Sequence, residues 1–188
     1  SIDYPGLSFF DDINVDKDKL WNEYPIFHSM EEVRNYFEFT DKRFSLGVGN
    51  PTFRYQLSKK FKQMNGDLIN LISDKAIISR RTNLGSEGIC ILRGAIVEAD
   101  VCIDNGCLIN LNVTIAHDTS VGEYSEISPG VHISGGCTIG RFCQIGTGAV
   151  VLPKISIGDS VVIGAGSVVT RDILANTKVV GNPARPMS

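Results

Sequence analysis

A six-residue repeat dominates the second half of the chain. From residue 91 to residue 169 every sixth position holds Ile or Val, without a slip. This period fits neither an α-helix, with about 3.6 residues per turn, nor a strand with alternating faces. It is typical of a β-helix in which three six-residue units complete each coil. The repeated positions are Ile91, Val97, Ile103, Ile109, Ile115, Val121, Ile127, Ile133, Ile139, Ile145, Val151, Ile157, Ile163 and Val169.

The repeat also predicts how the coil is filled. We expect the aliphatic side chains to point into a triangular prism and to stack on their equivalents in neighbouring coils. Glycine follows the aliphatic residue in five repeats, where we expect it to relieve backbone strain at the corners. These glycines are Gly122, Gly140, Gly146, Gly158 and Gly164. We therefore predict a mainly β fold, with a parallel β-helix over residues 73–188 and residues 73–90 leading into the coil.

Residues 1–72 follow a different pattern, in which strand and helix signals alternate. A Ser-Met-Glu-Glu capping box at residues 29–32 predicts a helix to about residue 39, and Asn50 followed by Pro51 predicts a second helix to about residue 63. Three strands are also predicted: one that ends at residues 8–10, before the first helix, one at residues 44–48, between the two helices, and one at residues 68–72, after the second helix. Such alternation is typical of a small parallel α/β, Rossmann-like domain.

Ligands of such domains bind beyond the carboxyl ends of the strands. Asp11, Asp12, Gly49 and Asn50 fall at these ends, where carboxylates accept hydrogen bonds from a nucleotide and a helix N-terminus binds a phosphate. Spacing alone favours a plainer interpretation, with a solvated acidic turn and a simple helix cap. The strand and Gly-rich phosphate loop that normally precede such an acidic position are expected to be absent from this chain.

Composition excludes several classes of partner. The net charge is −3 with no basic cluster, so nucleic acid is not an expected partner, and no apolar run is long enough to span a membrane. The first residues lack a signal peptide pattern, which favours a cytoplasmic protein. The five cysteines lie within the repeat without any CxxC spacing, so we expect reduced thiols and no metal site.

His117 is the outward-facing residue of the repeat that most suggests chemistry. It follows Ile115 by two positions and so lies at a corner, and one coil later the equivalent residue is Gly135. Glycine leaves a groove open beside the imidazole, while Asp118 can orient the ring and raise its basicity. Without further support, an ordinary surface histidine is the simpler interpretation. His132 and His28 are not spaced to share a metal with it.

Four short motifs stand out in the β-helix and at its end: Ile-Ala-His-Asp at 115–118, Val-Gly-Glu-Tyr at 121–124, Ile-Ser-Pro-Gly at 127–130 and Val-Gly-Asn-Pro-Ala-Arg at 180–185. Together they resemble the sialic acid O-acetyltransferase and nucleotide-amino-sugar N-acetyltransferase family of hexapeptide acyltransferases. The resemblance covers nearly the whole chain, including the Asp11-Asp12 strand end and the Gly49-Asn50 turn. It implies a left-handed β-helix, a homotrimer, and acetyl-CoA bound between neighbouring β-helices.

The resemblance also implies roles for particular residues. His117 is the expected general base supported by Asp118, and residues 1–72 are expected to hold the nucleotide of the acceptor. The acetyl-CoA site is expected near Glu126, Gly135, Thr147 and Ala165. Glu126 stands where the family commonly has a second histidine, which leaves its role open between the co-substrate, an acceptor ammonium and solvent.

The sequence leaves three functions open. The first is N-acetylation of a nucleotide-linked 4-amino-sugar for bacterial surface glycans, by direct transfer from acetyl-CoA. The second is O-acetylation of sialic acid or another hydroxyl acceptor. The third is a non-catalytic trimeric β-helix scaffold.

Overall fold

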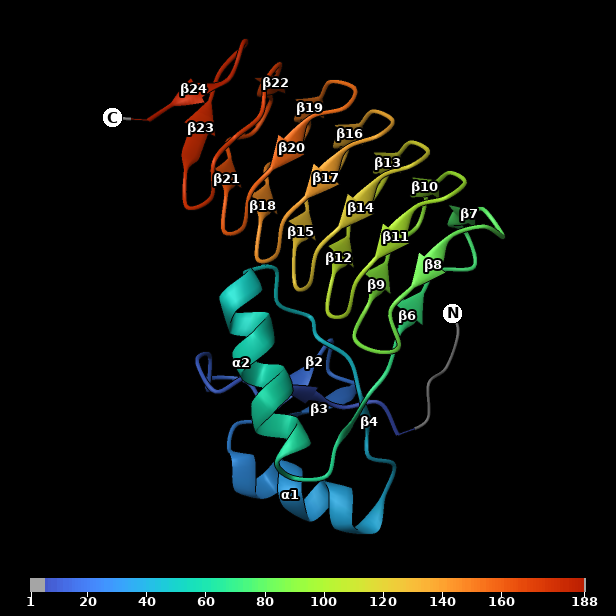
Figure 1. The fold of residues 1–188 in the computed structure, drawn as a ribbon. Helices are drawn as coiled ribbons and strands as arrows, with labels where there is room; N and C mark the ends of the chain where they lie inside the picture. Colours follow the sequence, from blue (N-terminus) through green and yellow to red (C-terminus); the bar gives the residue numbers. More distant parts are fainter. Residues whose placement is uncertain (1–5, 188) are drawn as a thin grey trace.

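The computed structural model describes residues 6–187 and shows a β-helix with a smaller N-terminal domain docked along its side (Figure 1). Short, mostly parallel strands form the three faces of the prism. The eight-stranded sheet contains β6 (Leu71–Ile72), β9 (Cys90–Ile91), β12 (Leu108–Ile109), β15 (Glu126–Ile127), β18 (Gln144–Ile145), β21 (Val162–Ile163), β23 (Lys178–Val180) and β24 (Arg185–Pro186).

The other two faces have six and five strands. The six-stranded sheet contains β7 (Ile77–Ile78), β10 (Ile96–Val97), β13 (Thr114–Ile115), β16 (His132–Ile133), β19 (Val150–Val151) and β22 (Val168–Val169). The five-stranded sheet contains β8 (Asn83–Leu84), β11 (Cys102–Ile103), β14 (Ser120–Val121), β17 (Thr138–Ile139) and β20 (Ser156–Ile157).

The predicted stacking of aliphatic side chains is confirmed. Val97 pairs with Ile115 and Ile115 with Ile133, so each strand lies beside its equivalent one coil further on. Their side chains are at most 2% exposed and belong to one continuous core. Cys107, Cys137 and Cys143 lie in the same core, as expected for reduced cysteines.

The glycines that follow the aliphatic positions have a different role from the one predicted. None of them has a positive φ; left-handed backbone occurs at the second residue of the turns instead, as at Asp118 and Gly136. A Cβ at Gly122 would lie 2.8 Å from the backbone of Arg141 in the next coil. Glycine is therefore required there because successive coils approach closely, and not because the backbone is strained.

The β-helix begins earlier than predicted. Ile78 pairs with Val97 over a separation of 19 residues, whereas Val97 pairs with Ile115 over 18, so one extra residue lies between β8 and β9. Residues 71–84 therefore form a first coil and do not merely lead into one. The strand predicted at 68–72 is two strands, and only β6 pairs with the β-helix. The predicted domain boundary between residues 72 and 73 thus falls just after β6.

Both predicted helices of the N-terminal domain are confirmed. Helix α1 (Met30–Phe39) begins with the capping box of Ser29 and Glu32, and α2 (Pro51–Lys62) begins with Asn50 as its cap. Aromatic and aliphatic side chains fill the space beside α1. The cluster consists of Val33, Phe37 and Phe61, with Phe10, Phe27, Met30, Tyr36, Phe44, Leu57 and Met64 packed against it.

The strands of this domain form two small sheets and not the single parallel sheet expected. β1 (Phe9–Phe10) pairs in parallel with β3 (Tyr24–Phe27), which pairs antiparallel with β2 (Lys19–Leu20). β4 (Arg43–Phe44) pairs in parallel with β5 (Asp67–Leu68). Helix α1 packs against β3 and, through Phe37, against Phe61 of α2. Of the two helices, α2 lies nearer the β-helix and α1 lies on the far side of α2 (Figure 1). The predicted domain extends to residue 1, but its first five residues lie outside the described part of the chain.

Helix α2 holds the two parts together through a buried arginine. The Arg54 side chain is 0% exposed and donates hydrogen bonds to the carbonyl oxygens of Leu46, Val48 and Gly106 at 2.9–3.1 Å. Ser58 contacts the Tyr124 hydroxyl at 3.0 Å. Because Gly106 and Tyr124 lie in turns from the five-stranded to the eight-stranded sheet, we call this edge the docking corner. These bonds satisfy a buried charge that would otherwise be costly.

Candidate active site

His117 lies in the turn between β13 and β14, at an edge of the prism that we call the His117 corner. Its Nδ1 is 2.8 Å from a carboxylate oxygen of Asp118, and both side chains are more than half exposed. A carboxylate only accepts hydrogen bonds, so Nδ1 carries the proton and the neutral ring has its lone pair on Nε2. Within residues 6–187, Nε2 has no hydrogen-bond partner. The pair is therefore arranged as an oriented, exposed base.

Acidic neighbours tune this base. The hydrogen bond to Asp118 raises the pKa of His117 above its ordinary value, and the negative charges of Asp118, Glu98 and Asp100 raise it further. Glu98 also accepts the backbone N–H of His117 at 3.1 Å. Glu98 is not among the residues predicted from the sequence. The coil length could have placed it near His117, because residue 99 lies one coil before residue 117.

Gly135 lies directly against the imidazole. A Cβ at this position would stand 2.8 Å from both Cε1 and Nε2 of His117. The space that glycine leaves is thus filled partly by the ring itself and is not simply an open groove. The neighbouring Gly136 N–H donates to the His117 carbonyl at 2.9 Å, whereas the Gly135 N–H has no partner among the described residues.

The two acidic residues at the end of β1 differ in their environments. Asp11 accepts the backbone N–H groups of Ile13 and Asn14 and the side-chain amide of Asn14. These bonds, those from Asn14 first, hold the pKa of Asp11 below its ordinary value. Asp12 is exposed and forms no hydrogen bond or ion pair with the described residues. Asp11 therefore shapes the turn, and Asp12 remains available to a ligand.

Gly49, which precedes the Asn50 cap of α2, lies beside Glu126, a residue that the family resemblance places near acetyl-CoA. A Cβ on Gly49 would be 3.6 Å from a carboxylate oxygen of Glu126, and Asn50 already accepts the Phe53 N–H as the cap of α2. Glu126 is 8% exposed and accepts hydrogen bonds from Ser128 and Gln144. A negative charge this close makes the α2 N-terminus a poor phosphate site, because like charges repel.

The remaining predicted residues lie on another edge. Thr147 and Ala165 are exposed turn residues that join the eight-stranded to the six-stranded sheet, and we call this edge the Thr147 corner. The Gly166 N–H donates to the Thr147 carbonyl at 2.8 Å, which stacks the two turns.

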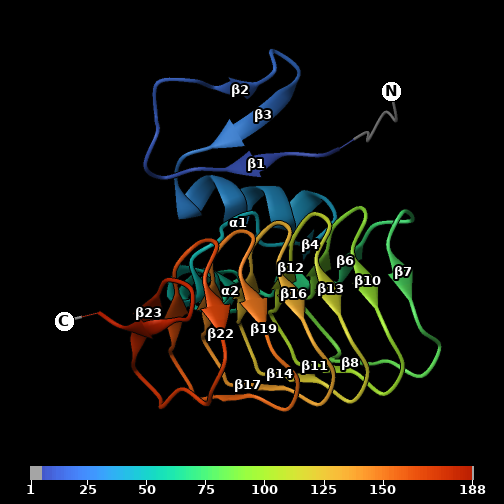
Figure 2. The same ribbon diagram turned by 90° about the horizontal axis from the view of Figure 1, so that it is seen from above.

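One chain does not bring the predicted residues together. His117, Asp118 and Gly135 form one cluster, and Gly49, Asn50 and Glu126 form a second. The N-terminal domain is attached at the docking corner, and in both views the turns after β13 and β16 lie away from it (Figures 1 and 2). The acidic turn and His117 therefore cannot meet within a single chain.

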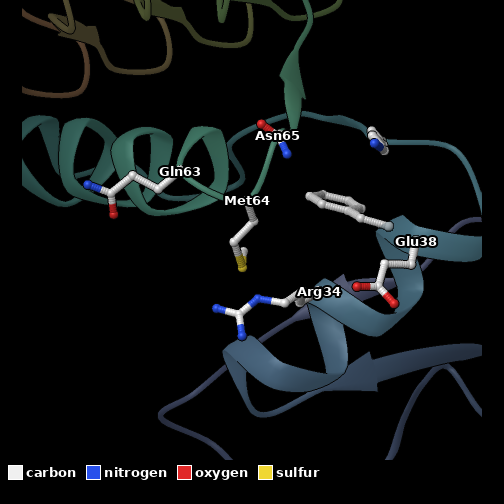
Figure 3. A pocket seen from close by; sticks show the side chains of 7 residues that line it. Arg34, Glu38, Gln63, Met64 and Asn65 are labelled. Atoms are coloured by element: carbon white, nitrogen blue, oxygen red, sulfur yellow. The ribbon is translucent and has the colours of Figure 1, made fainter.

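A separate hollow of about 200 Å³ opens between the C-terminal ends of α1 and α2. The Arg34 and Met64 side chains face each other across it (Figure 3). It contains none of the predicted site residues. Within the described residues, no group of three or more His, Cys, Asp or Glu side chains is arranged for a metal. No helix there has the length and apolar character to cross a membrane.

Comparison with known proteins defines the class. The bacterial transferase hexapeptide (six repeats) family matches residues 136–171. Together with solved acetyltransferase structures of the same fold, this match confirms the expected left-handed parallel β-helix preceded by a small α/β domain. The chain is a hexapeptide-repeat acetyltransferase, as its resemblance to that family implied.

Three solved structures are similar over most of their length. A mutant of perosamine N-acetyltransferase from Caulobacter crescentus, in complex with CoA and GDP-perosamine, is 27% identical with a TM-score of 0.84 and coverage of 88% of this chain and 78% of that one. The acetyltransferase domain of PglB from Neisseria gonorrhoeae, in complex with acetyl coenzyme A, is 28% identical with a TM-score of 0.87, and the match covers 98% of this chain and 87% of that one. WeeI from Acinetobacter baumannii is 26% identical with a TM-score of 0.85, and the match covers 96% of this chain and 85% of that one.

Proposed function

We propose that this acetyltransferase transfers the acetyl group of acetyl-CoA to the amine of a nucleotide-linked 4-amino-sugar, in bacterial surface glycan synthesis. The observation that carries the chemistry is the His117–Asp118 pair, with Nδ1 oriented and Nε2 exposed. The acceptor class is supported by the Caulobacter relative, which is solved with GDP-perosamine, and the co-substrate by relatives solved with CoA or acetyl-CoA.

His117 acts as the general base in this proposal. The acceptor nitrogen attacks the thioester carbonyl carbon while Nε2 takes a proton from the amine, and the C–S bond then breaks to release CoA. The Gly135 N–H, which has no partner among the described residues and lies next to His117, is proposed to stabilise the developing oxyanion. Asp118 holds the ring in the correct tautomer and stabilises the imidazolium that forms.

Direct transfer is supported by the poor nucleophilicity of the three core thiols. Burial raises the pKa of Cys107 to about 12, and burial also raises the pKa values of Cys137 and Cys143. These cysteines remain protonated at neutral pH and donate to backbone carbonyls inside the core. An acyl-enzyme on any of these three residues is therefore not expected.

The active site is proposed to form between chains of a homotrimer. The His117 corner, the Thr147 corner and the acidic turn are separated in one chain, so only a second copy can place them around one pair of substrates. Co-expression of His117→Ala with Asp12→Ala tests this arrangement. At an acceptor concentration well below KM neither parent should be fully active, whereas mixed trimers should regain activity at sites that combine the two intact surfaces. Light scattering that shows a monomer at micromolar concentration would contradict it.

A direct assay decides between N- and O-acetylation. Release of the CoA thiol is measured with nucleotide amino-sugars, with the matched nucleotide sugars that carry a hydroxyl in place of the amine, and with free sialic acid. Turnover of the amino-sugar alone supports the proposal. Turnover of a hydroxyl acceptor alone would favour the O-acetyltransferase alternative, since a neutral histidine can also take a hydroxyl proton. Failure to bind CoA would point back to the scaffold.

A further inference from the structure

His28 connects α1 to the loop that carries Asp12. It follows β3 and precedes the Ser29 cap of α1, and its ring contacts both ends of the loop between β1 and β2, residues 11–18. Nδ1 lies 2.6 Å from the Asp11 carbonyl oxygen, and Nε2 lies 3.0 Å from the Lys17 carbonyl oxygen. Both ring nitrogens therefore face backbone carbonyls.

These two contacts specify the protonation state of the ring. A carbonyl oxygen can only accept a hydrogen bond, and a neutral imidazole has one N–H to donate. In the neutral form, one ring nitrogen would direct its lone pair at a carbonyl oxygen, which is repulsive. Only the imidazolium donates to both Asp11 and Lys17. The geometry therefore requires a cation at His28 when the loop has this conformation.

The surrounding charges favour the cation. The loop contributes the carboxylates of Asp11 and Asp18, α1 contributes Glu32, and Lys17 is the opposing positive charge. Glu32 also accepts the backbone N–H of His28 at 2.9 Å. The hydrogen bond to the Asp11 carbonyl, then that to the Lys17 carbonyl and the charges of Glu32 and Asp18, raise the pKa of His28 above its ordinary value.

The contact with Asp11 bears directly on Asp12. The Asp11 carbonyl belongs to the peptide plane that joins Asp11 to Asp12, so fixing this oxygen fixes the direction in which the chain enters Asp12. Two backbone bonds already hold the ends of the loop, Asp11 N–H to Phe27 O and Ile26 N–H to Asp18 O, each at 2.9 Å. His28 adds the bond that orients the peptide between the two acidic residues.

We propose that His28, as an imidazolium, is a positioning residue for the acceptor site, because it aims Asp12 at the nucleotide of the acceptor. This inference rests on the proposed function, in which Asp12 contacts the acceptor. It predicts opposite effects of pH on two kinetic constants. Rising pH deprotonates His28 and raises the acceptor KM, whereas the same rise converts His117 to its active neutral form and raises kcat.

The test compares the wild-type protein with His28→Gln and with the control His132→Gln over pH 6 to 9. His132 is an exposed histidine whose ring contacts the Thr114 hydroxyl, remote from the loop. Glutamine has a single donor nitrogen and cannot reproduce both contacts. The wild-type acceptor KM should rise about tenfold across this range, because a charge-assisted hydrogen bond is lost. His28→Gln should have the raised KM throughout, with kcat and the acetyl-CoA KM unchanged.

Two results would overturn the inference. In the first, His28→Gln has the same acceptor KM as the wild-type protein at every pH. His28 would then have no effect on acceptor binding. The second is a pKa of His28, measured by NMR titration of the ring nitrogens, at or below the ordinary ~6.5. If no nucleotide amino-sugar is acetylated or bound, the proposed function fails instead. The NMR titration needs no substrate and still decides whether the imidazolium exists.

Discussion

The two parts of this molecule solve the problem of folding in different ways. In the β-helix the short strands pair with their equivalents one coil away, and small and aliphatic side chains, mostly Ile and Val, fill the interior. In the N-terminal domain no unit repeats, and the interior is a cluster dominated by aromatic rings between two capped helices and two small sheets. The β-helix gains rigidity by repetition, whereas the domain depends on individual contacts such as Arg54 and His28.

The proposed function divides between these two parts. His117, the proposed base, lies in a turn between neighbouring coils, where Gly135 lies against its ring and the Glu98 carboxylate accepts its backbone N–H. Asp12 lies in a loop held by a few hydrogen bonds, one of which depends on a titratable side chain. Under the proposed function, the chemistry would lie on the repetitive part and recognition of the acceptor on the aperiodic part.

The largest effect is expected from breaking the repeat. Ile139→Asp should prevent folding, because Ile139 is 1% exposed in the aliphatic column and a carboxylate there has neither water nor a partner. The desolvation cost is several kcal/mol, comparable to the whole stability of a domain. Thermal unfolding followed by circular dichroism measures the effect. The control is Thr138→Asp, the exposed neighbour on the same strand. Equal melting temperatures for the two variants would mean that the six-residue register is wrong.

The repeat also decides how much of the fold could be predicted from sequence. From residue 91 onward the period fixed the strands and the buried face, because each coil repeats the same geometry. The first coil was missed although its aliphatic residues Ile72, Ile78 and Leu84 keep the spacing of six. One inserted residue before β9 shifts them out of register with Ile91, and a pattern extended backwards from Ile91 meets Gly85 and Ser79 instead.

The N-terminal domain shows where such reasoning stops. Helix caps are local signals, so α1 and α2 were predicted correctly. Strand pairing is not local, so the sequence did not reveal that β3 completes the sheet beside β1. Arg54 did carry a signal, since it lies on the buried stripe of α2 with Pro51, Ser58 and Phe61. The dual role of the His28 ring depends on where two distant carbonyls fall, and no spacing in the sequence encodes that.

The next largest effect concerns the fixed base. His117→Ala should lower kcat by roughly 10²- to 10⁴-fold, the usual contribution of a positioned general base, with little change in acetyl-CoA affinity. Asp118→Asn should lower kcat less, because it alters the support of the base and not the base itself. Steady-state kinetics at saturating acceptor measures both. Near-full activity of the alanine variant would make His117 an ordinary surface residue.

The pH profile sharpens this test. Asp118 raises the pKa of His117, and the base must be neutral to accept a proton. The wild-type kcat should therefore fall as pH drops through a pKa above the ordinary ~6.5. In Asp118→Asn this acid limb should move to lower pH, since the hydrogen bond to a carboxylate is lost. A limb that does not move would assign the titration to another group, such as the acceptor amine.

At the junction of the two parts the expected effect is on stability and not on catalysis. Arg54→Leu leaves the carbonyls of Leu46, Val48 and Gly106 without their donor, at a cost of about 1–3 kcal/mol for each group that stays buried. The single tryptophan, Trp21, reports on the N-terminal domain by fluorescence, while far-UV circular dichroism reports mainly on the β-helix. The fluorescence transition should shift to lower temperature than in the exposed control Arg34→Leu. If both signals shift equally, the two parts unfold as one unit.

The smallest effect is expected at the acceptor loop, where it also separates two adjacent carboxylates. Asp12→Ala should raise the acceptor KM by about tenfold, the loss of one charge-assisted hydrogen bond, and leave kcat, the acetyl-CoA KM and the melting temperature unchanged. Asp11→Ala should instead loosen the turn, because the Asp11 carboxylate accepts hydrogen bonds from Ile13 and Asn14.

The control for the loss of negative charge is Asp16→Ala, since Asp16 is an exposed residue of the same loop. An acceptor KM that changes equally in Asp12→Ala and Asp16→Ala would reduce the effect to general electrostatics. A parallel loss of acetyl-CoA affinity would place Asp12 at the acetyl-CoA site. The assignment of acceptor binding to the N-terminal domain and of the chemistry to the β-helix would then be wrong.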